Sequence, residues 1–462
     1  MKRKQFFKNS SLAFLGTALF NSAVAAISDK AAGSARNIIF MVSDGMSNGT
    51  LSMADLLMQR KWGKQSAWLG LYDEQSVARA LMDTASASSF VTDSAAASSS
   101  WGGGVRVKNG SLNVNADGSS NRPILQKFKA AGKAVGCVTT VPITHATPAG
   151  FCVTNGKRDD QPGIALDYLS LRFDVMMGGG LEYFSKEKRA DKEDVLSRFR
   201  QSGFDVVLDK ETMEQASGNK PLLGVFHESG IPFALDAANL QEKKSVPTLA
   251  AMTRKALSVL SKNRNGFVMQ VEGGKVDWAA HANDCGALLY DQIAFDEAVK
   301  TAIDFAREDK HTLVVITTDH GNANPGLFYG EKANVHFDSL QQYKYTNEWV
   351  LNGISNQTPV KALIDRVVEA QGWILKDDEA RELLEYYTNL TDDGLYNPRH
   401  LPFKRYAQMQ EKHTSIGWGA MDHSGDYVEL AMFGPGKELL PPFVKNYELH
   451  NLLLKAAGVS KS

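Results

Sequence analysis

The chain has 462 residues, of which 43% are hydrophobic and 22% are charged, and its formal net charge is −1. Such a composition is typical of a globular protein that buries a large core, as one large α/β domain or as two or three smaller ones. The near-neutral charge, with neither a basic face nor an acidic tail, argues against nucleic acid and against charge-driven partners.

The first 26 residues have the composition of a targeting segment. A basic stretch, MKRKQFFKNS, precedes an apolar stretch, SLAFLGTALF, and the small residues AVA at 23–25 provide a cleavage site. We therefore expect residues 1–26 to be an export signal peptide and the mature protein to reach a bacterial periplasm or the extracellular space. RKQFFK resembles a twin-arginine signal with Lys4 in place of the second arginine, so the export route stays open. No later segment is long and apolar enough to cross a bilayer, so we expect no membrane span in the mature chain.

Strand-like and helical patterns alternate along the rest of the chain. This alternation predicts an α/β fold, a three-layer sandwich whose central sheet is mostly parallel and carries helices on both faces. A long helix-rich stretch separates the third and fourth of the predicted strands. We predict strands over 37–45, 133–141, 174–180, 267–274 and 311–321, and helices over 93–100, 123–132 and 285–309.

Residues 322–420 depart from this alternation. ALIDRVVEAQGWI and DDEARELLEYYTN have the period of amphipathic helices, and neither precedes a strong strand. We interpret the segment as a helical insertion that covers the sheet edge near the predicted site. It would belong to a single domain over 27–462 and would not be an independent domain.

Acidic residues lie at the ends of three predicted strands, namely Asp44, Glu272 and Asp319. Sites of open α/β sheets gather outside the carboxyl ends of the strands, so we expect these carboxylates to lie close together. His320 follows Asp319 in the run TTDHGN. Such a pair can be a capping pair, a general base with the residue that orients it, or two ligands of one metal ion.

The segment VEGGKVDWAAHAND adds Asp277 and His281, which are four residues apart. On a helix they share one face and can hold one cation. The alternative is a helix N-terminus at which acidic residues favour the dipole. His423, in MDHSGDYVEL, is a further candidate ligand just before another strand-like run.

Two more segments carry candidate phosphate-binding residues. Ser94, in VTDSAAASSS, begins a helix of small residues, where backbone N–H groups favour an anion, although an ordinary N-cap has the same sequence. ITHATPAG supplies His145 and Thr147, and Arg158 follows. Arginine is well suited to hold two phosphate oxygens at once, although a lone arginine is more often part of a surface ion pair.

The three cysteines, Cys137, Cys152 and Cys285, are too few for a dense disulfide framework, and their odd number leaves at least one thiol free. Cys137 lies in a predicted buried strand, which favours an inert core thiol. A bridge between Cys137 and Cys152 is compatible with an oxidising compartment, and the sequence does not decide between the two.

Six motifs, taken in chain order, resemble those of the alkaline phosphatase family: MVSDGMS, TDSAAA, HATPAG, VEGGKVDWAAHAND, TTDHGN and DHSGDYV. The resemblance extends over about residues 36–436 and is weakest over about 322–410. It implies an exported, metal-dependent enzyme that hydrolyses small-molecule phosphate monoesters, with 27–462 as its alkaline phosphatase domain. It also suggests a homodimer.

The resemblance further implies a role for each matching residue. Ser94 would be the nucleophile that becomes phosphorylated, and Arg158 would hold the phosphate. His145 flanks the third metal site, and because imidazole is a softer donor than carboxylate, we expect this site to admit Zn²⁺ or Co²⁺ as well as Mg²⁺. The implied ligands are Asp277, His281 and His423 for a first zinc ion, Asp319 and His320 for a second, and Thr147 and Glu272 for magnesium, with Asp44 bridging.

A phosphodiesterase or a sulfatase of the same superfamily is the alternative enzyme. Sulfatases need a modified Cys or Ser in a different motif, and the phosphodiesterase relatives tend to use Thr and lack the third metal site. Ser94, Glu272, Thr147 and Arg158 together argue against both. An exported metal-binding or phosphate-binding protein without catalysis is a further alternative, although none of the expected residues is missing. The natural substrate is not indicated, because recognition in this family centres on the phosphoryl group.

Overall fold

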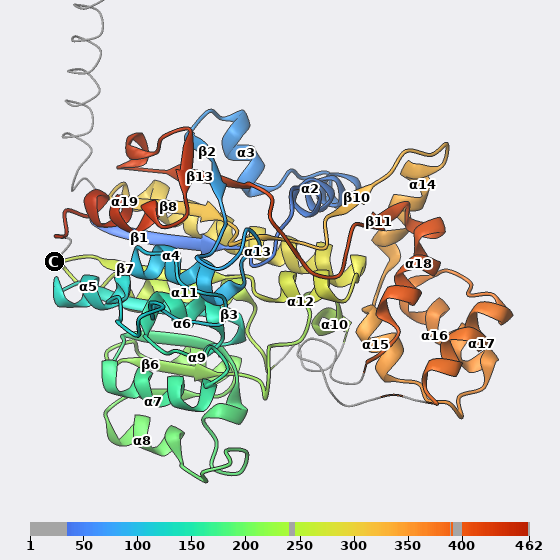
Figure 1. Ribbon diagram of the computed structural model, residues 1–462, viewed down its shortest axis with the longest axis horizontal. Helices are drawn as coiled ribbons and strands as arrows, with labels where there is room; N and C mark the ends of the chain where they lie inside the picture. The colour runs from blue at the N-terminus through green and yellow to red at the C-terminus, as the bar shows by residue number, and fades with distance from the viewer. Residues whose placement is uncertain (1–34, 240–244, 389, 391–399, 461–462) are drawn as a thin grey trace, which may run out of the picture.

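The computed structural model describes residues 35–239, 245–388, 390 and 400–460 (Figure 1). The predicted export signal lies outside the described residues. A ten-stranded sheet forms the centre of the fold. Its strands follow the order β14 (Phe443–Lys445), β2 (Val77–Asp83), β13 (Val428–Phe433), β8 (Thr312–Thr317), β1 (Asn37–Val42), β7 (Phe267–Glu272), β3 (Ala134–Pro142), β4 (Val175–Gly179), β6 (Leu222–Val225) and β5 (Asp205–Val207).

The sheet is mostly parallel, as the sequence predicts. β1 pairs in parallel with β7 on one side and with β8 on the other. β13 runs antiparallel to both of its neighbours, β8 and β2. β5 and β6 lie in the stretch that the sequence analysis describes as helix-rich, so that prediction was incomplete. These strands have three and four residues, which is too short for a reliable period-two signal.

Helices cover both faces of the sheet because its central strands are apolar on both sides. Alternate residues of a strand point to opposite faces. Phe40 of β1 joins one hydrophobic core and its neighbour Met41 joins the other. This arrangement confirms the predicted three-layer sandwich (Figure 1). The first core is covered by α4 (Ser94–Gly103), α5 (Ile124–Ala130), α6 (Ala146–Cys152), α7 (Gln161–Leu171), α8 (Val195–Gln201) and α19 (Glu448–Ala456), and the second by α2 (Asn48–Trp62), α3 (Ala67–Asp73), α9 (Lys210–Gln215), α11 (Leu249–Leu260), α12 (Lys275–His281) and α13 (Cys285–Asp309).

A third hydrophobic cluster lies beside the sandwich, at the right of Figure 1, and includes residues of α14 to α18. The chain enters this region through β9 (Gly321–Asn322) and β10 (Pro325–Leu327) and leaves it through β11 (Ile416–Trp418) and β12 (His423–Ser424). β10 pairs with β11 and β9 pairs with β12, so the two ends of the excursion meet. The boundaries of the insertion over 322–420 stay a prediction. The remaining helices are α10 (Ala234–Asn239), α14 (Ala333–Asp338), α15 (Asn347–Asn352), α16 (Val360–Gln371), α17 (Asp377–Tyr386) and α18 (Phe403–Thr414).

Two of these helices, α16 and α17, correspond to the amphipathic helices that the sequence predicts in this region. The cluster packs onto the sandwich through residues such as Leu57 of α2 and Leu289 of α13. Within the described residues, no helix has both the length and the apolar character that a membrane span requires.

Candidate metal centre

The predicted site residues converge at the carboxyl edge of the sheet. Val42, at the end of β1, lies in register with Glu272 at the end of β7 and with Thr317 at the end of β8. Asp44 and Asp319 follow β1 and β8 by two residues each, so the three carboxylates meet where three neighbouring strands end. All three are fully buried.

Part of the site offers mainly oxygen atoms, and we call Asp44, Thr147 and Glu272 the oxygen side. Thr147, in α6, donates from Oγ1 to Asp44 Oδ2 at 3.0 Å. Thr139, near the end of β3, donates to Glu272 Oε2. Asp44, Glu272 and His145 each offer one possible ligand atom, and these atoms lie within 4.8 Å of one another. Three elements of the fold thus direct side chains toward one small volume.

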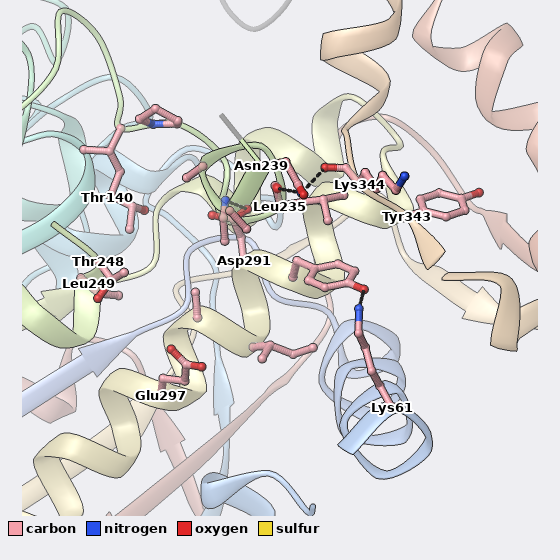
Figure 2. Close-up of a pocket in the computed structure, with 18 of the residues that line it drawn as sticks. Lys61, Thr140, Leu235, Asn239, Thr248, Leu249, Asp291, Glu297, Tyr343 and Lys344 are labelled. Atoms are coloured by element: carbon pink, nitrogen blue, oxygen red, sulfur yellow. Dashed lines mark hydrogen bonds between the residues drawn. The ribbon is translucent and has the colours of Figure 1, made fainter. Parts of the chain in front are cut away.

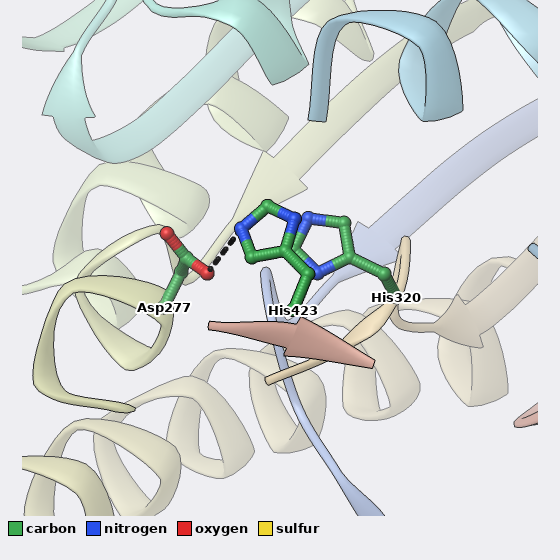
Figure 3. A group of neighbouring side chains, drawn as sticks. All are labelled: Asp277, His320 and His423. Carbon is green, nitrogen blue, oxygen red and sulfur yellow. Dashed lines mark ion pairs between the residues drawn. The ribbon is translucent and has the colours of Figure 1, made fainter. Parts of the chain in front are cut away.

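The adjacent part of the site is rich in imidazole, and we call Asp277, His281, Asp319, His320 and His423 the histidine side. His281 Nε2 and His423 Nε2 are 3.1 Å apart, and each lies 3.5 Å from a carboxylate oxygen of Asp277. His320 stacks on His423 with 3.7 Å between ring centroids, and its Nε2 lies 3.2 Å from Asp319 Oδ2. Figure 3 shows Asp277, His320 and His423 gathered around one point.

Backbone carbonyls fix the direction of two of these imidazoles. His281 Nδ1 lies 2.7 Å from the carbonyl oxygen of Met421, and His423 Nδ1 lies 2.8 Å from that of Thr92. A carbonyl oxygen can only accept, so both Nδ1 atoms donate and both Nε2 atoms present lone pairs when the rings are neutral. These two nitrogen atoms, 3.1 Å apart and beside the carboxylate of Asp277, are arranged so that they could share one cation.

Electrostatics differ between the two sides. On the oxygen side, burial and the neighbouring carboxylates raise the pKa of Asp44 well above its usual value, and burial raises the pKa of Glu272 to about 7. On the histidine side, burial also disfavours the charge of Asp277, but the three neighbouring imidazoles together outweigh it and lower its pKa to about 2. The pKa of Asp319 is lowered as well, because His320 outweighs the effect of burial.

Ser94 begins α4 at this site and is fully buried. Its Oγ lies 3.3 Å from His320 Nε2. Asp93 is the N-cap of the helix, because its Oδ1 accepts from the backbone N–H of Ala96 at 2.9 Å. The hydroxyl of Ser94 therefore lies both next to the histidine side and in the field of a helix N-terminus.

Arg158 connects this helix end to the oxygen side. It donates from Nη1 to Asp93 Oδ2 at 3.1 Å, and its Nη2 lies 3.2 Å from His145 Nε2. A guanidinium only donates, so in this ring orientation His145 Nε2 accepts and its Nδ1 carries the proton. To bind a cation, the imidazole would have to exchange its contact with Arg158 for the metal ion. Burial and the charge of Arg158 lower the pKa of His145 to about 3, so the ring is neutral near pH 7.

Buried polar atoms without partners indicate where cations would bind. In the described part of the chain, Asp44 Oδ1, Glu272 Oε1, Asp277 Oδ2 and Asp319 Oδ2 are buried and have no hydrogen-bond partner. A buried, unpaired carboxylate oxygen costs free energy unless a cation pairs with it. The donor set fits metal ions, with imidazole and carboxylate suited to zinc on the histidine side and hard oxygens suited to magnesium on the oxygen side.

All of the predicted site residues thus meet at one edge of the sheet, although their roles as ligands and nucleophile stay predictions. Three further polar residues hold them in place, and no motif in the sequence singles these residues out. These are Asp93, which pairs with Arg158, Thr139, which donates to Glu272, and Asn322, whose Nδ2 donates to Asp277 Oδ1 at 2.7 Å. Each lies in or beside a quoted motif or strand end, but its partner is distant in the sequence.

A cavity of about 1030 Å³ lies in another part of the molecule, among α2, α10 and α13 (Figure 2). Apolar residues such as Leu235 and Ile293 line it together with the charged residues Lys61, Asp291 and Glu297. Among the described residues that line it, none belongs to the predicted site.

Comparisons with known proteins agree with this geometry. The family model for alkaline phosphatase matches residues 35–459. Alkaline phosphatase 4 of Bacillus subtilis is 28% identical over 432 residues, which cover 92% of this chain and 89% of the relative. Alkaline phosphatase 3 of the same organism is 29% identical over 456 residues, covering 97% of this chain and 95% of the relative. The crystal structure of Thermus thermophilus alkaline phosphatase has a TM-score of 0.86 at 30% identity, covering 93% of this chain and 92% of that chain.

The family match spans almost the whole described chain, and the fold agrees with that of a solved alkaline phosphatase over nearly its full length. The chain therefore belongs to the alkaline phosphatase family and is a phosphoric monoester hydrolase.

Proposed function

We propose that the chain hydrolyses small phosphate monoesters through a covalent phosphoserine at Ser94, with two zinc ions on the histidine side and one magnesium ion on the oxygen side. The observation that carries the proposal is the position of the Ser94 hydroxyl. Its Oγ lies 3.3 Å from His320 Nε2, next to a group of imidazoles and carboxylates whose unpaired atoms fit cations.

The residues that would hold each cation follow from the two sides. Asp277, His281 and His423 would hold one zinc ion, and Asp319 and His320 the other. Asp44 lies between the sides, since its Oδ1 is 3.6 Å from His320 Nε2 while its Oδ2 accepts from Thr147. Glu272 and Thr147 would complete the magnesium site. Because His145 flanks this site with a softer nitrogen donor, Zn²⁺ or Co²⁺ would also be able to bind there. When bound, these ions would neutralise the phosphate dianion and favour the ionised form of the serine hydroxyl.

The side chains around Ser94 bind and orient the ester. Arg158 has the planar fork that pairs with two phosphate oxygens, and Asp93 holds this guanidinium beside the nucleophile. The N–H groups at the start of α4 add partial positive charge on the same side. Ser94 Oγ attacks phosphorus and the alcohol leaves, and water then cleaves the phosphoserine to release inorganic phosphate and restore the hydroxyl. Most of the barrier reduction comes from this charge complementarity.

The test compares release of p-nitrophenol from its phosphate monoester, its phosphate bis-ester and its sulfate ester. We expect the monoester to be the preferred substrate by a wide margin and Ser94→Ala to lower its turnover by at least about 10³-fold. Ser52→Ala is the matched control, because Ser52 lies on an exposed position of α2 and donates only to a backbone carbonyl. Preference for the bis-ester would favour a phosphodiesterase, and preference for the sulfate ester a sulfatase.

A phosphorylated chain trapped by rapid acid quench should carry its phosphoryl group on the peptide that contains Ser94. An unmodified peptide in an enzyme with full turnover would contradict the covalent step and would leave direct attack by water as the mechanism.

Export and assembly are part of the same proposal. The predicted signal at 1–26 supports export to the periplasm or the extracellular space, and the family supports a homodimer with no nucleic acid partner. Recovery of active protein from the periplasmic fraction, with an N-terminus close to residue 26, would bear out export. Sedimentation equilibrium would show whether the mass is that of two chains.

A further inference from the structure

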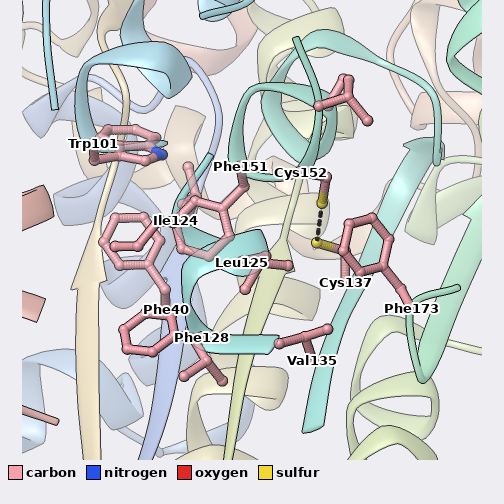
Figure 4. Packing of buried hydrophobic residues seen from close by; sticks show 14 of the residues in the cluster. Phe40, Trp101, Ile124, Leu125, Phe128, Val135, Cys137, Phe151, Cys152 and Phe173 are labelled. Atoms are coloured by element: carbon pink, nitrogen blue, oxygen red, sulfur yellow. Dashed lines mark hydrogen bonds between the residues drawn. The ribbon is translucent and has the colours of Figure 1, made fainter. Parts of the chain in front are cut away.

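Two cysteines that the catalytic proposal does not use lie side by side behind the oxygen side. Cys137 is in β3, and Cys152 is the last residue of α6. Their sulfur atoms are 3.5 Å apart, as the dashed line in Figure 4 marks. Both side chains are almost fully buried. The structure records both cysteines as thiols.

The surroundings of the two sulfurs are apolar. They belong to the hydrophobic core that also contains Ile124, Leu125 and Phe173, and Phe173 lies next to Cys137 in Figure 4. Apart from each other, the polar contact recorded for these sulfurs is the one between Cys137 Sγ and Gln270 Oε1, at 3.9 Å. Burial raises the pKa of the Cys152 thiol well above its usual value, which disfavours a thiolate nucleophile or a metal ligand in the folded chain.

The segment between the two cysteines supplies one residue of the oxygen side, Thr147, and two side chains next to that side, Thr139 and His145. Thr139 follows Cys137 by two residues and donates to Glu272, and Thr147 precedes Cys152 by five residues and donates to Asp44. His145 lies in the same segment. A covalent link between the two sulfurs would therefore close a loop that carries three of the side chains around this cation group.

We propose that Cys137 and Cys152 form a disulfide while the chain folds in an oxidising compartment, and that this bond fastens α6 to β3 beneath the oxygen side. For the bond to form, the sulfurs must approach from 3.5 Å to the bonded distance of about 2.05 Å. The inference rests on the proposed export for its oxidant and on the proposed cation site for its consequence.

The bond forms by thiol–disulfide exchange. The thiolate of one cysteine attacks a small-molecule or enzyme disulfide and releases one thiol of that oxidant. The second cysteine, as thiolate, then attacks the mixed disulfide and releases the other thiol. The two cysteines lose two hydrogens, and the oxidant disulfide is reduced to two thiols. Because both sulfurs are buried in the native fold, exchange takes place before α6 closes over β3.

Thiol mapping of the exported wild-type chain tests the bond directly. The protein is denatured, alkylated without reductant and digested with trypsin. Cys137 and Cys152 fall in one tryptic peptide, residues 134–157, which contains no internal Lys or Arg. We expect this peptide to be unalkylated and lighter than its reduced form by two hydrogen atoms, while Cys285 is alkylated in full.

Refolding of the full chain in vitro tests formation of the disulfide without export, because glutathione then supplies the oxidant. With oxidised glutathione present, Cys137 and Cys152 in this peptide should form the disulfide, and with reduced glutathione both should remain thiols. If Cys137 and Cys152 are alkylated in the exported protein and also after oxidative refolding, the proposal is wrong. A bridge from either residue to Cys285 would overturn it equally. Turnover of p-nitrophenyl phosphate, measured on the same samples, reports on the phosphatase activity independently of the bond.

Single variants show what the bond does. Cys137→Ala and Cys152→Ala should each lower the melting temperature of the oxidised protein by about 3–6 °C and speed the loss of magnesium to a chelator several-fold. The difference in melting temperature between each variant and wild type should become smaller when the proteins are refolded under reducing conditions. Cys285→Ala is the matched control, since this cysteine is also buried but has no sulfur partner among the described residues. If the melting temperatures of all three variants responded equally to redox conditions, the proposed role of the bond would be contradicted.

Discussion

On the histidine side, the carboxylate of Asp277 is kept ionised by neighbouring imidazoles, whereas on the oxygen side burial and like charges raise the pKa values of Asp44 and Glu272. The two sides share the same sheet edge, so the difference comes from their partners and not from their depth. The imidazoles of the histidine side lower the pKa values of Asp277 and Asp319. The oxygen side has no comparable internal partner and should depend more on added cation concentration.

Removal of an imidazole from the histidine side should have the largest effect. His320→Ala deletes a side chain that contacts Ser94 Oγ and lies beside Asp319, so we expect turnover of p-nitrophenyl phosphate to fall by about 10³-fold or more, together with loss of bound zinc. His311→Ala, at an exposed position before β8, should leave both turnover and zinc content unchanged. Full zinc content in the first variant would remove His320 from the ligand set.

Loss of a hydroxyl from the oxygen side should have a smaller effect that added cation can reverse. Thr147→Val keeps the size of the side chain but removes the contact to Asp44, so we expect activity at low magnesium to fall by about 10–100-fold. A titration with magnesium should restore a large part of it, with half-saturation at a higher concentration than in wild type. Magnesium dependence equal to that of wild type would place the third cation elsewhere.

Replacement of the imidazole that flanks the oxygen side should change the choice of cation more than the rate. His145→Asp exchanges a soft nitrogen donor for a hard oxygen donor, so the ratio of activity with magnesium to activity with cobalt should rise by about 3–10-fold. The measurement is activity after removal of the third cation and reloading with each metal. An unchanged ratio, with exclusive dependence on magnesium in wild type, would refute the expectation that the third site admits softer ions.

Asp291 is a buried carboxylate outside the predicted site, so it shows the effect of burial on a pKa without any predicted metal ion nearby. Burial raises the pKa of Asp291, in the cavity wall, to about 7, compared with about 3.9 in an unfolded chain. The folded protein therefore binds a proton that the unfolded chain has released. This contribution to stability is complete below about pH 4 and is lost as the pH rises through about 7.

Asp291→Asn should remove this pH dependence and leave the turnover of p-nitrophenyl phosphate unchanged. Urea unfolding at several pH values should show that the free energy of unfolding of wild type, relative to the variant, falls between about pH 5 and pH 7 by at most about 1.4 kcal/mol per pH unit. Asp304→Asn, at an exposed position of α13, is the control and should show no such difference. A constant difference across the pH range would mean that Asp291 ionises normally.

The sequence predicts the central part of the fold well, because its strands are long, apolar on both faces and followed by polar residues. β1, β7 and β8 each have six residues, all of them buried, and Asp44, Glu272 and Asp319 mark their carboxyl ends. Convergence of these three carboxylates follows from parallel pairing. The predicted ligands Asp277 and His281 can be found from the sequence because they lie four residues apart on one helix.

Other features depend on contacts that no local pattern reveals. His423 reaches the site because β12 pairs with β9, about a hundred residues earlier in the chain. The contact between Arg158 and Asp93 and the approach of Cys137 to Cys152 likewise depend on packing between separate elements. β5, at one edge of the sheet, and its neighbour β6 are short, so their sequence pattern does not differ from that of a loop or a helix turn.

The central claim is that distant side chains form neighbouring cation sites which face one serine hydroxyl. Crystals of the enzyme loaded with zinc in the presence of excess magnesium, measured on both sides of the zinc absorption edge, test it most directly. We predict two strong anomalous peaks roughly 4 Å apart, one among Asp277, His281 and His423 and one beside Asp319 and His320, both facing Ser94 Oγ. A single peak, or peaks remote from Ser94, would contradict the account.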